Sequence, residues 1–470
     1  MATTNSKYQE NFRDAISTVD TSGKRVWVYP KKPGGRYYTW RKWTSYLLLA
    51  LLFSGPFLKI GGQPLLMMNI LERKFVIFGS LFTPQDFHIF VLGMILFIIF
   101  IVVFTVAFGR IWCGWACPQT IFMEMVFRRI EYWIEGDANQ QKKLNAAPWT
   151  SEKIRKKTFK YSIFFFLSFL IANTFLGYIV GGDRLLAMVT LPPAENWTIF
   201  TALVIFTGVF YWVFASFREQ ACTTVCPYGR LQGVLLVKET INVAYDYLRG
   251  EPRGKLKKNK VTEANQSQGD CIDCKLCVQV CPTGIDIRNG VQLECVNCTA
   301  CIDACDNVMD KIGKPRGLIR YASEENIEAK KPFQFTPRLM GYTAILVVLL
   351  SVIGYSLTSR GIVETTVLRA PGQMFHKAEN GNIRNLYTVQ VVNKTSEDLP
   401  IELKLKQPEG GTVEIVGETI LLKAEQNVDG AFFIELPVDK LKGMKTPIEM
   451  EVYTDGKFLE SVSTTFYGPN

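Results

Sequence analysis

Charged residues and histidine are scarce in this chain of 470 residues, a length that suggests two to four domains. Lys, Arg, Asp and Glu make up 20% of the sequence, whereas soluble proteins carry about 25%. Hydrophobic residues reach 48%, which excludes a disordered or fibrous chain. The two histidines, His88 and His376, are expected to be interfacial or hydrogen-bonded residues rather than metal ligands.

Four stretches contain no charged residue at all: 87–109, 161–182, 196–217 and 339–359. Each is long enough to cross a bilayer, which takes about 20 apolar residues. A fifth stretch, 43–58, is shorter and contains a Gly-Pro pair, but it can still span with tryptophans at the interface. The sequence therefore predicts a multi-domain membrane protein with a five-span α-helical membrane domain.

The distribution of Lys and Arg predicts how the spans are oriented. These residues concentrate in 1–42, 110–160 and 218–338, and they are rare in 61–86 and 181–197. Because cytoplasmic loops carry an excess of Lys and Arg, the three cationic segments are expected in the cytoplasm and the C-terminal region outside. The net charge of +10 is then a topology signal, not a sign of nucleic-acid binding. No cleavable signal peptide is expected, since the first 39 residues are polar.

All twelve cysteines lie in the segments expected to be cytoplasmic, where disulfides are rare. Eight of them form two runs of C-x2-C-x2-C-x3-C, the spacing of a bacterial two-cluster ferredoxin, in which the fourth cysteine of each run binds the other cluster. Zinc is the alternative, but paired zinc ligands are usually separated by longer loops. We therefore expect one 4Fe–4S cluster on Cys271, Cys274, Cys277 and Cys305, and a second on Cys281, Cys295, Cys298 and Cys301.

The other four cysteines form two Cys-x3-Cys-Pro motifs, which directly follow the second and fourth expected spans. A spacing of four places both sulfurs of a motif on one face if the segment is helical. The two pairs can therefore form one four-thiolate site, and soft sulfur donors favour Cu(I), zinc or iron–sulfur. Inert buried thiols or a disulfide are the alternatives. The site consists of Cys113, Cys117, Cys222 and Cys226.

Five expected domains follow from these patterns. They are a flexible cytoplasmic arm (1–42), four spans with the Cys-x3-Cys-Pro motifs (43–217, the second motif ending at 227), a cytoplasmic region (218–337) with an inserted two-cluster ferredoxin-like α+β module at about 265–310, the fifth span (338–359) and a C-terminal domain (360–470).

The C-terminal domain has the pattern of a β-sandwich. Apolar and polar residues alternate between turn residues over 386–392, 401–405, 412–416, 430–436 and 448–453. This pattern predicts an immunoglobulin-like β-sandwich, with a different small β fold as the alternative. Nothing in it suggests catalysis, so its expected role is to bind a partner.

Several strings along nearly the whole chain resemble the CcoG (FixG, RdxA) family of cytochrome oxidase accessory proteins. They include GRIWCGWACPQT at 109–120, CPYGRLQ at 226–232, KPRGLIR at 314–320 and NIRNLYT at 382–388. The resemblance implies a multi-pass protein of the bacterial inner membrane that helps assemble a cbb3-type cytochrome c oxidase. It also implies a metal (cupric) reductase that converts Cu(II) to Cu(I), with copper at the Cys-x3-Cys-Pro motifs.

Partners and location follow from the same resemblance. It implies a copper ion or copper chaperone, oxidase subunits or assembly factors, and an electron donor that is a cytoplasmic molecule or the quinone pool. The N-terminus and ferredoxin module are expected in the cytoplasm and the C-terminal domain in the periplasm. Two alternatives stay open: a quinol-linked electron-transfer subunit of a dehydrogenase, and a redox-sensing structural assembly factor.

Overall fold

The chain folds into two compact units. The first, the redox unit, comprises Met1–Ser54, Gly93–Leu176 and Leu185–Leu350, and the second, the β unit, comprises Gly55–Leu92, Gly177–Arg184 and Ser351–Asn470. The computed structural model describes residues 18–19, 22, 24–60, 62–69, 74–82, 86–255, 268–329, 336–359, 361–372, 374–378, 381–395, 398–417, 421–423 and 426–469. The first 17 residues of the expected arm, and residues 265–267 of the expected module, lie outside the described residues.

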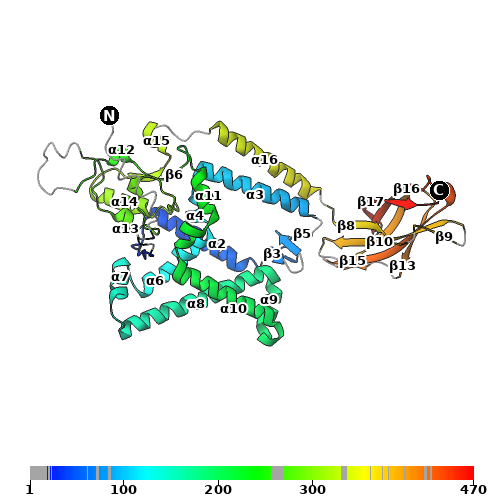
Figure 1. The fold of residues 1–470 in the computed structure, drawn as a ribbon, viewed down its shortest axis with the longest axis horizontal. Helices are drawn as coiled ribbons and strands as arrows, with labels where there is room; N and C mark the ends of the chain where they lie inside the picture. Colours follow the sequence, from blue (N-terminus) through cyan, green and yellow to red (C-terminus); the bar gives the residue numbers. More distant parts are fainter. Residues whose placement is uncertain are drawn as a thin grey trace. The chain divides into compact units, whose positions relative to one another are not determined.

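Four helical segments in the described ranges are long and apolar enough to cross a membrane (Figure 1). At most 39% of the apolar window of any of them is buried within the protein. Most of their apolar side chains therefore need a second apolar medium, which lipid supplies. They are α3 (Phe87–Phe108), α8 (Ser151–Val180), Pro193–Phe217 with α10 (Trp197–Trp212), and α16 (Pro337–Thr358).

The first expected span differs from these four. Its helix, α2 (Arg36–Ser54), begins seven residues before the expected start at 43 and ends before the Gly-Pro pair. Arg41 in its second turn is 3% exposed and donates hydrogen bonds to the carbonyl oxygens of Gly114 and Cys298, each at 2.9 Å. The beginning of α2 is therefore anchored within the redox unit. The described residues hold four spans by length and composition, and the fifth stays a prediction.

Short helices connect the spans, and three of them, η2, η4 and η5, are π-helices. Rings from η2, α8 and η4 form an aromatic core, in which Phe127 lies 4.8 Å from both Phe164 and Phe214 between ring centroids. The connecting helices are α4 (Ile111–Trp115), α5 (Pro118–Thr120), η2 (Ile121–Phe127), α6 (Arg128–Ile134), α7 (Ala138–Ala146), α9 (Gly182–Thr190), η3 (Pro193–Asn196), η4 (Val213–Phe217), η5 (Ala221–Val225) and α11 (Pro227–Leu235).

The ferredoxin-like module consists of small helices and one two-stranded antiparallel sheet, β6 (Asn242–Tyr245) with β7 (Ile319–Ala322). Its apolar core includes Val243, Ile302 and Met309. The helices are α12 (Tyr247–Gly250), α13 (Leu276–Gln279), η7 (Ile287–Asn289), α14 (Ala300–Lys311) and α15 (Glu324–Ala329).

The described part of the N-terminal arm is docked on this module. Lys31 N–H donates to the carbonyl of Gln279 at 2.7 Å. The N–H groups of Tyr37 and Tyr38 donate to the Asp303 carboxylate at 3.1 and 2.8 Å. This part of the arm is therefore held in place, contrary to the expectation of a flexible segment, because backbone donors find partners on the module.

The C-terminal part of the β unit is an immunoglobulin-like β domain, as the alternation predicts. One sheet has the order β13-β15-β10-β8, with β9 paired to β10, a second has the order β12-β16-β17, and β11 pairs with β14. Side chains from both sheets, among them Tyr387, Phe432 and Met450, share one buried core. The strands are β8 (Val363–Arg369), β9 (His376–Lys377), β10 (Ile383–Asn393), β11 (Leu399–Pro400), β12 (Glu402–Gln407), β13 (Thr412–Val416), β14 (Leu421–Leu422), β15 (Asn427–Leu436), β16 (Lys445–Thr454) and β17 (Lys457–Tyr467), with the 3-10 helix η8 (Val438–Lys440) before β16.

Two small sheets precede α3 in the same unit. Their strands are β1 (Lys59–Ile60), β2 (Gln63–Pro64), β3 (Leu66–Asn69), β4 (Lys74–Ile77) and β5 (Ser80–Phe82). Within this unit the buried Lys394 ammonium binds Asp86 at 2.8 Å and Glu364 at 2.7 Å. This ion pair links the β domain to the residue that precedes α3.

Candidate redox centres

The two cysteine runs of the module repeat one unusual backbone conformation. In the first run, Asp273 and Lys275 have φ of 49° and 56°. In the second, Asn297 and Thr299 at the equivalent positions have φ of 52° and 64°. Non-glycine residues rarely adopt positive φ and do so mainly at functional sites. Four such residues at matched positions show that both loops are wrapped in the same way around the space between their cysteines.

Two neighbouring cavities lie inside these loops. Cys277 lines both of them. Besides Cys277, the first cavity is lined by Cys281, Cys295, Cys298 and Cys301. Besides Cys277, the second is lined by Cys271, Cys274 and Cys305. The structure therefore gathers all eight cysteines of the two runs around two adjacent spaces.

The chemistry of these thiols fits iron–sulfur clusters. All twelve cysteines are free. Burial raises the pKa of Cys277, Cys295 and Cys305 to about 12 each, so without a cation these thiols keep their protons at neutral pH. In the described part of the chain, no three His, Cys, Asp or Glu side chains converge closely enough for one metal ion. A cubane differs from a single ion because its four thiolates bind four separate iron atoms.

The remaining four cysteines, Cys113, Cys117, Cys222 and Cys226, belong to the two Cys-x3-Cys-Pro motifs and are here called the four-thiol site. In each motif the second cysteine caps a helix whose first residue is the proline: Cys117 precedes α5 and Cys226 precedes α11. Proline suits this position because the first N–H of a helix has no partner. Burial, with charge repulsion from the other three thiols, raises the pKa of Cys222 to about 12. Cys222 also packs against the buried cluster that contains Cys113.

Backbone contacts join the four-thiol site to the first cavity. A Cβ atom built on Gly114 would lie 2.6 Å from the carbonyl oxygens of Val296 and Asn297. Arg41 binds the carbonyls of Gly114 and Cys298 together. A third cavity is lined by both Cys222 and Pro282. The loops that carry the two cysteine sites are therefore in direct backbone contact.

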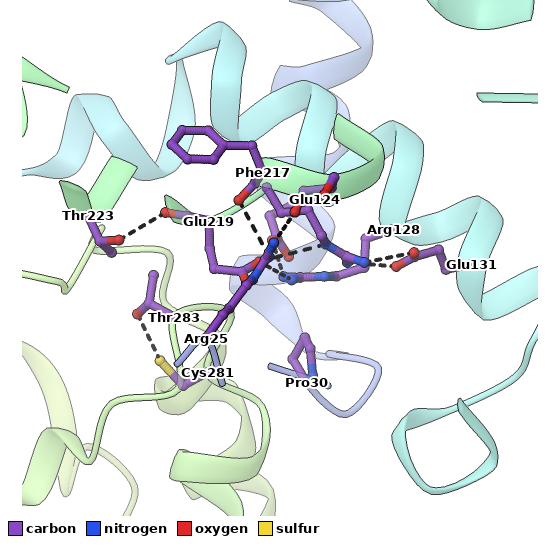
Figure 2. A network of polar contacts seen from close by, with 12 residues as sticks. Arg25, Pro30, Glu124, Arg128, Glu131, Phe217, Glu219, Thr223, Cys281 and Thr283 are labelled. Atoms are coloured by element: carbon purple, nitrogen blue, oxygen red, sulfur yellow. Dashed lines mark hydrogen bonds and ion pairs between the residues drawn. The ribbon is translucent and has the colours of Figure 1, made fainter. Parts of the chain in front are cut away.

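A network of buried charges lies beside the third cavity (Figure 2). Arg218 donates two hydrogen bonds to Glu131, at 2.9 and 2.7 Å, and both side chains are 3% exposed. Burial alone would raise the pKa of Glu131, but Arg218 and Lys160 outweigh it and hold that pKa below its usual range. Arg25 of the N-terminal arm binds Glu219 at 3.2 Å. The network also includes Glu124 and Arg128.

Sequence reasoning did not single out the buried polar residues around the thiols. Arg41, Arg110 and Gln232 are 3%, 4% and 0% exposed. Arg110 lies three residues before Cys113, and Gln232 lies six after Cys226, so proximity to the motifs was the available signal. The two histidines contribute to no metal-binding group among the described residues.

Comparisons with known proteins agree with this arrangement. Three family models match the chain: "4Fe-4S binding domain" over residues 90–137, "4Fe-4S dicluster domain" over 217–324, and the "IG-like fold at C-terminal of FixG" over 353–469. Protein RdxB of Cereibacter sphaeroides is 36% identical over 398 residues, which cover 81% of this chain and 82% of RdxB. Protein RdxA of the same organism is 36% identical over 409 residues, covering 84% and 85%. Nitrogen fixation protein FixG of Rhizobium meliloti is 31% identical over 435 residues, covering 84% and 82%.

Proposed function

The chain belongs to the family of RdxA, RdxB and FixG, and on this premise we propose that it passes electrons through two 4Fe–4S clusters to the four-thiol site, where Cu(II) is reduced to Cu(I). We assign the first cluster to Cys271, Cys274, Cys277 and Cys305, and the second to Cys281, Cys295, Cys298 and Cys301. When bound, such clusters accept and release single electrons. One electron converts one Cu(II) substrate ion to Cu(I).

The contact at Gly114 is the observation that carries this proposal. The loop between Cys113 and Cys117 touches the backbone of Val296 and Asn297, which lie between two cysteines of the second assigned set. Arg41 holds the same two loops together through buried hydrogen bonds. Direct backbone contact gives an electron a short route between the sites without movement of the protein.

Thiolates suit the proposed substrate, because soft sulfur donors hold Cu(I) better than Cu(II). Met123 and Cys222 line the cavity between the two sites, and thioether and thiolate sulfur are both Cu(I) ligands. The product would then be held in a form that can be handed to a copper chaperone or to an oxidase subunit.

A second occupant of the four-thiol site is favoured by two observations. No three donors among the described residues converge on one ion, and a 4Fe–4S family model covers residues 90–137, which include Cys113 and Cys117. A third iron–sulfur cluster at this site would make the chain an electron carrier between a donor such as a quinol and a further acceptor.

The biological role that we propose is assembly of a cbb3-type cytochrome c oxidase in a bacterial inner membrane. The ferredoxin-like module would lie in the cytoplasm, where Lys and Arg concentrate. The C-terminal domain would lie in the periplasm and bind an oxidase subunit or assembly factor, provided that α2 serves as the fifth span.

The test starts from anaerobically purified protein. Two clusters predict about eight irons per chain, and three predict about twelve. The clusters are reduced with dithionite, excess reductant is removed, and Cu(II) is added with a Cu(I)-selective chelator. The proposal expects reoxidation of the clusters as Cu(I) appears. It also expects that Cys113→Ser with Cys226→Ser stops this reaction while the module keeps its iron.

The matched substitution Cys274→Ser in the module should have the opposite signature, with iron lost and the four-thiol site intact. Copper turnover retained in the double variant would refute the assignment of the copper site. Clusters that stay reduced while no Cu(I) forms beyond a blank would show that copper is not the substrate. In that case quinols and the assembly-factor role are tested next.

A further inference from the structure

The thiol of Cys113 has one buried side-chain neighbour whose hydrogen bonding is incomplete. Gln232 in α11 is 0% exposed, and its Oε1 accepts a hydrogen bond from Cys113 Sγ at 3.5 Å. Its amide nitrogen Nε2 lies toward the Tyr228 hydroxyl but makes no hydrogen bond of good geometry within the described residues. A buried donor without a partner costs about 1–3 kcal/mol. The present orientation of the Gln232 amide is therefore not the most favourable one once a metal or cluster is bound at the four-thiol site.

Metal binding at Cys113 would change the hydrogen bond between Cys113 and Gln232. A cysteine that binds a metal is a thiolate, so Cys113 could no longer donate a proton to Oε1. The two ends of a glutamine amide have nearly the same shape. Turning the amide over brings Nε2–H to Cys113 Sγ and Oε1 toward Tyr228, whose hydroxyl lies beside it. Both ends of the amide would then have partners.

Arg110 is a second buried donor close to Cys113. It is 4% exposed, it donates to the carbonyl of Leu293, and its Nε has no hydrogen-bond partner in the part of the chain that the structure describes. A Cβ atom on Gly229 would lie 2.9 Å from this guanidinium, 3.0 Å from the Cys222 carbonyl oxygen and 3.8 Å from Cys226 Cβ. Gly229 therefore leaves room for a positive charge beside the second Cys-x3-Cys-Pro segment.

We infer that Gln232 and Arg110 are N–H donors to the thiolates of the four-thiol site and that they raise the reduction potential of the centre bound there. Reduction adds one negative charge to a thiolate centre. A hydrogen bond or a buried cation stabilises that charge more in the reduced state than in the oxidised state. Electrons that reach the module are then drawn toward the four-thiol site, whether copper or an iron–sulfur cluster occupies it.

This inference rests on the proposed redox role of the four-thiol site, and its test separates the two. The protein is titrated anaerobically with dithionite and followed by electron paramagnetic resonance. The signal of the four-thiol centre is the one that Cys113→Ser removes. Two variants replace the donor: Gln232→Met keeps the length of the side chain without any N–H, and Gln232→Glu keeps its shape but replaces the nitrogen with oxygen.

We expect the midpoint potential of this one signal to fall in both variants, and further in Gln232→Glu, whose carboxylate adds negative charge. The signals of the two module clusters should keep their potentials. The control is Gln141→Met, which removes a buried glutamine of α7 that donates to the carbonyl of Gly136. Metal content per chain is measured for every variant.

An unchanged midpoint in loaded Gln232→Met and Gln232→Glu would overturn the inference and leave the proposed function standing. A wild-type protein that shows no redox signal at the four-thiol site, either as purified or after addition of Cu(II), would overturn both. A measurement on the wild-type protein covers the case in which the variants do not fold. Electron–nuclear double resonance should detect an exchangeable proton coupled to the centre, and its absence would also overturn the inference.

Discussion

Substitution of Gly114 by alanine should separate the two cysteine sites without removing either. The new Cβ would lie 2.6 Å from two carbonyl oxygens and 2.8 Å from the carbonyl carbon of Asn297. Ordinary C–H···O contacts begin at about 3.3 Å, so the loops must move apart by roughly 0.7 Å. All three neighbours are backbone atoms, and no side-chain rotation can relieve the contact. Overpacking of this kind costs about 1–3 kcal/mol.

The consequence for function can be measured directly. In Gly114→Ala the iron content should equal that of the wild type, because no cysteine is touched. Transfer of electrons from dithionite-reduced clusters to the four-thiol site, followed by stopped flow with Cu(II) and a Cu(I) chelator, should be slower. The hydrogen bonds of Arg41 to Gly114 and Cys298 should weaken as well, which adds to the loss of thermal stability.

The matched control is Gly208→Ala in α10. A Cβ at Gly208 meets nothing within 4 Å, and alanine in place of glycine within a helix stabilises by about 1 kcal/mol. Wild-type stability and wild-type transfer rate in Gly114→Ala would refute the reasoning, because they would mean that the contact is neither tight nor on the electron route. A slower rate in Gly208→Ala would show that the assay responds to unrelated changes.

Three further predictions concern ion pairs. Glu131→Gln removes the carboxylate that binds the buried Arg218 at 2.7 Å and leaves it the longer contact with Glu219 at 3.7 Å. This change should lower the free energy of unfolding by about 3–5 kcal/mol, whereas replacing both Glu131 and Arg218 by apolar residues should cost less. Thermal unfolding in detergent tests both. Burial would raise the pKa of Asp286, but its arginine partner outweighs it and holds that pKa below the usual range. The contribution of Asp286 to the free energy of unfolding is therefore present above its unfolded pKa near 4, and it is lost as the pH falls through its lower folded pKa. The Asp286→Asn variant should retain less iron at pH 7, and its stability should change less with pH in the acid range. Lys394→Met should destabilise the β unit by more than about 1 kcal/mol, because it removes the buried cation that both Asp86 and Glu364 bind. Lys404→Met, at an ion pair whose side chains are 58% and 57% exposed, should cost less than about 1 kcal/mol.

The sequence predicts the parts of this structure that depend on local pattern. Charge-free stretches and alternating strands are local signals, and the four spans and the β domain agree with them. The strand at 412–416 matches β13 at both ends. The sequence pattern did not predict β17. In the structure, Asp455 and Gly456 have φ of 43° and 74° and form the two-residue hairpin turn that leads into β17. The Asp-Gly pair was the signal that could have found it.

What the sequence does not give depends on contacts between distant segments. Arg41 reads as a basic residue at a membrane interface, yet it is buried because Gly114 and Cys298, far away in the chain, supply its acceptors. Gln232 likewise reads as one polar residue of a short helix. Only the packing of α11 against the first Cys-x3-Cys-Pro motif places its amide at a sulfur. The ligand sets of the clusters stay a prediction that iron counting and spectroscopy must test.

The π-helices lie in or next to the Cys-x3-Cys-Pro motifs. Such helices are rare, well under 1% of residues in soluble proteins, and they concentrate at functional sites. Those in the described chain flank the cysteine motifs: η2 begins four residues after Cys117, and η5 contains Cys222. The wider turn shifts the following residues around the helix axis, and it leaves backbone groups that need new partners. Arg25 meets part of this need by donating to the carbonyls of Ser216 and Phe217 at the end of η4 (Figure 2). The buried charges and the π-helices therefore depend on each other. The π-helical backbone of η5 sets the position of the Cys222 sulfur, and Arg25, which binds both Glu219 and the end of η4, helps to hold this part of the backbone in place.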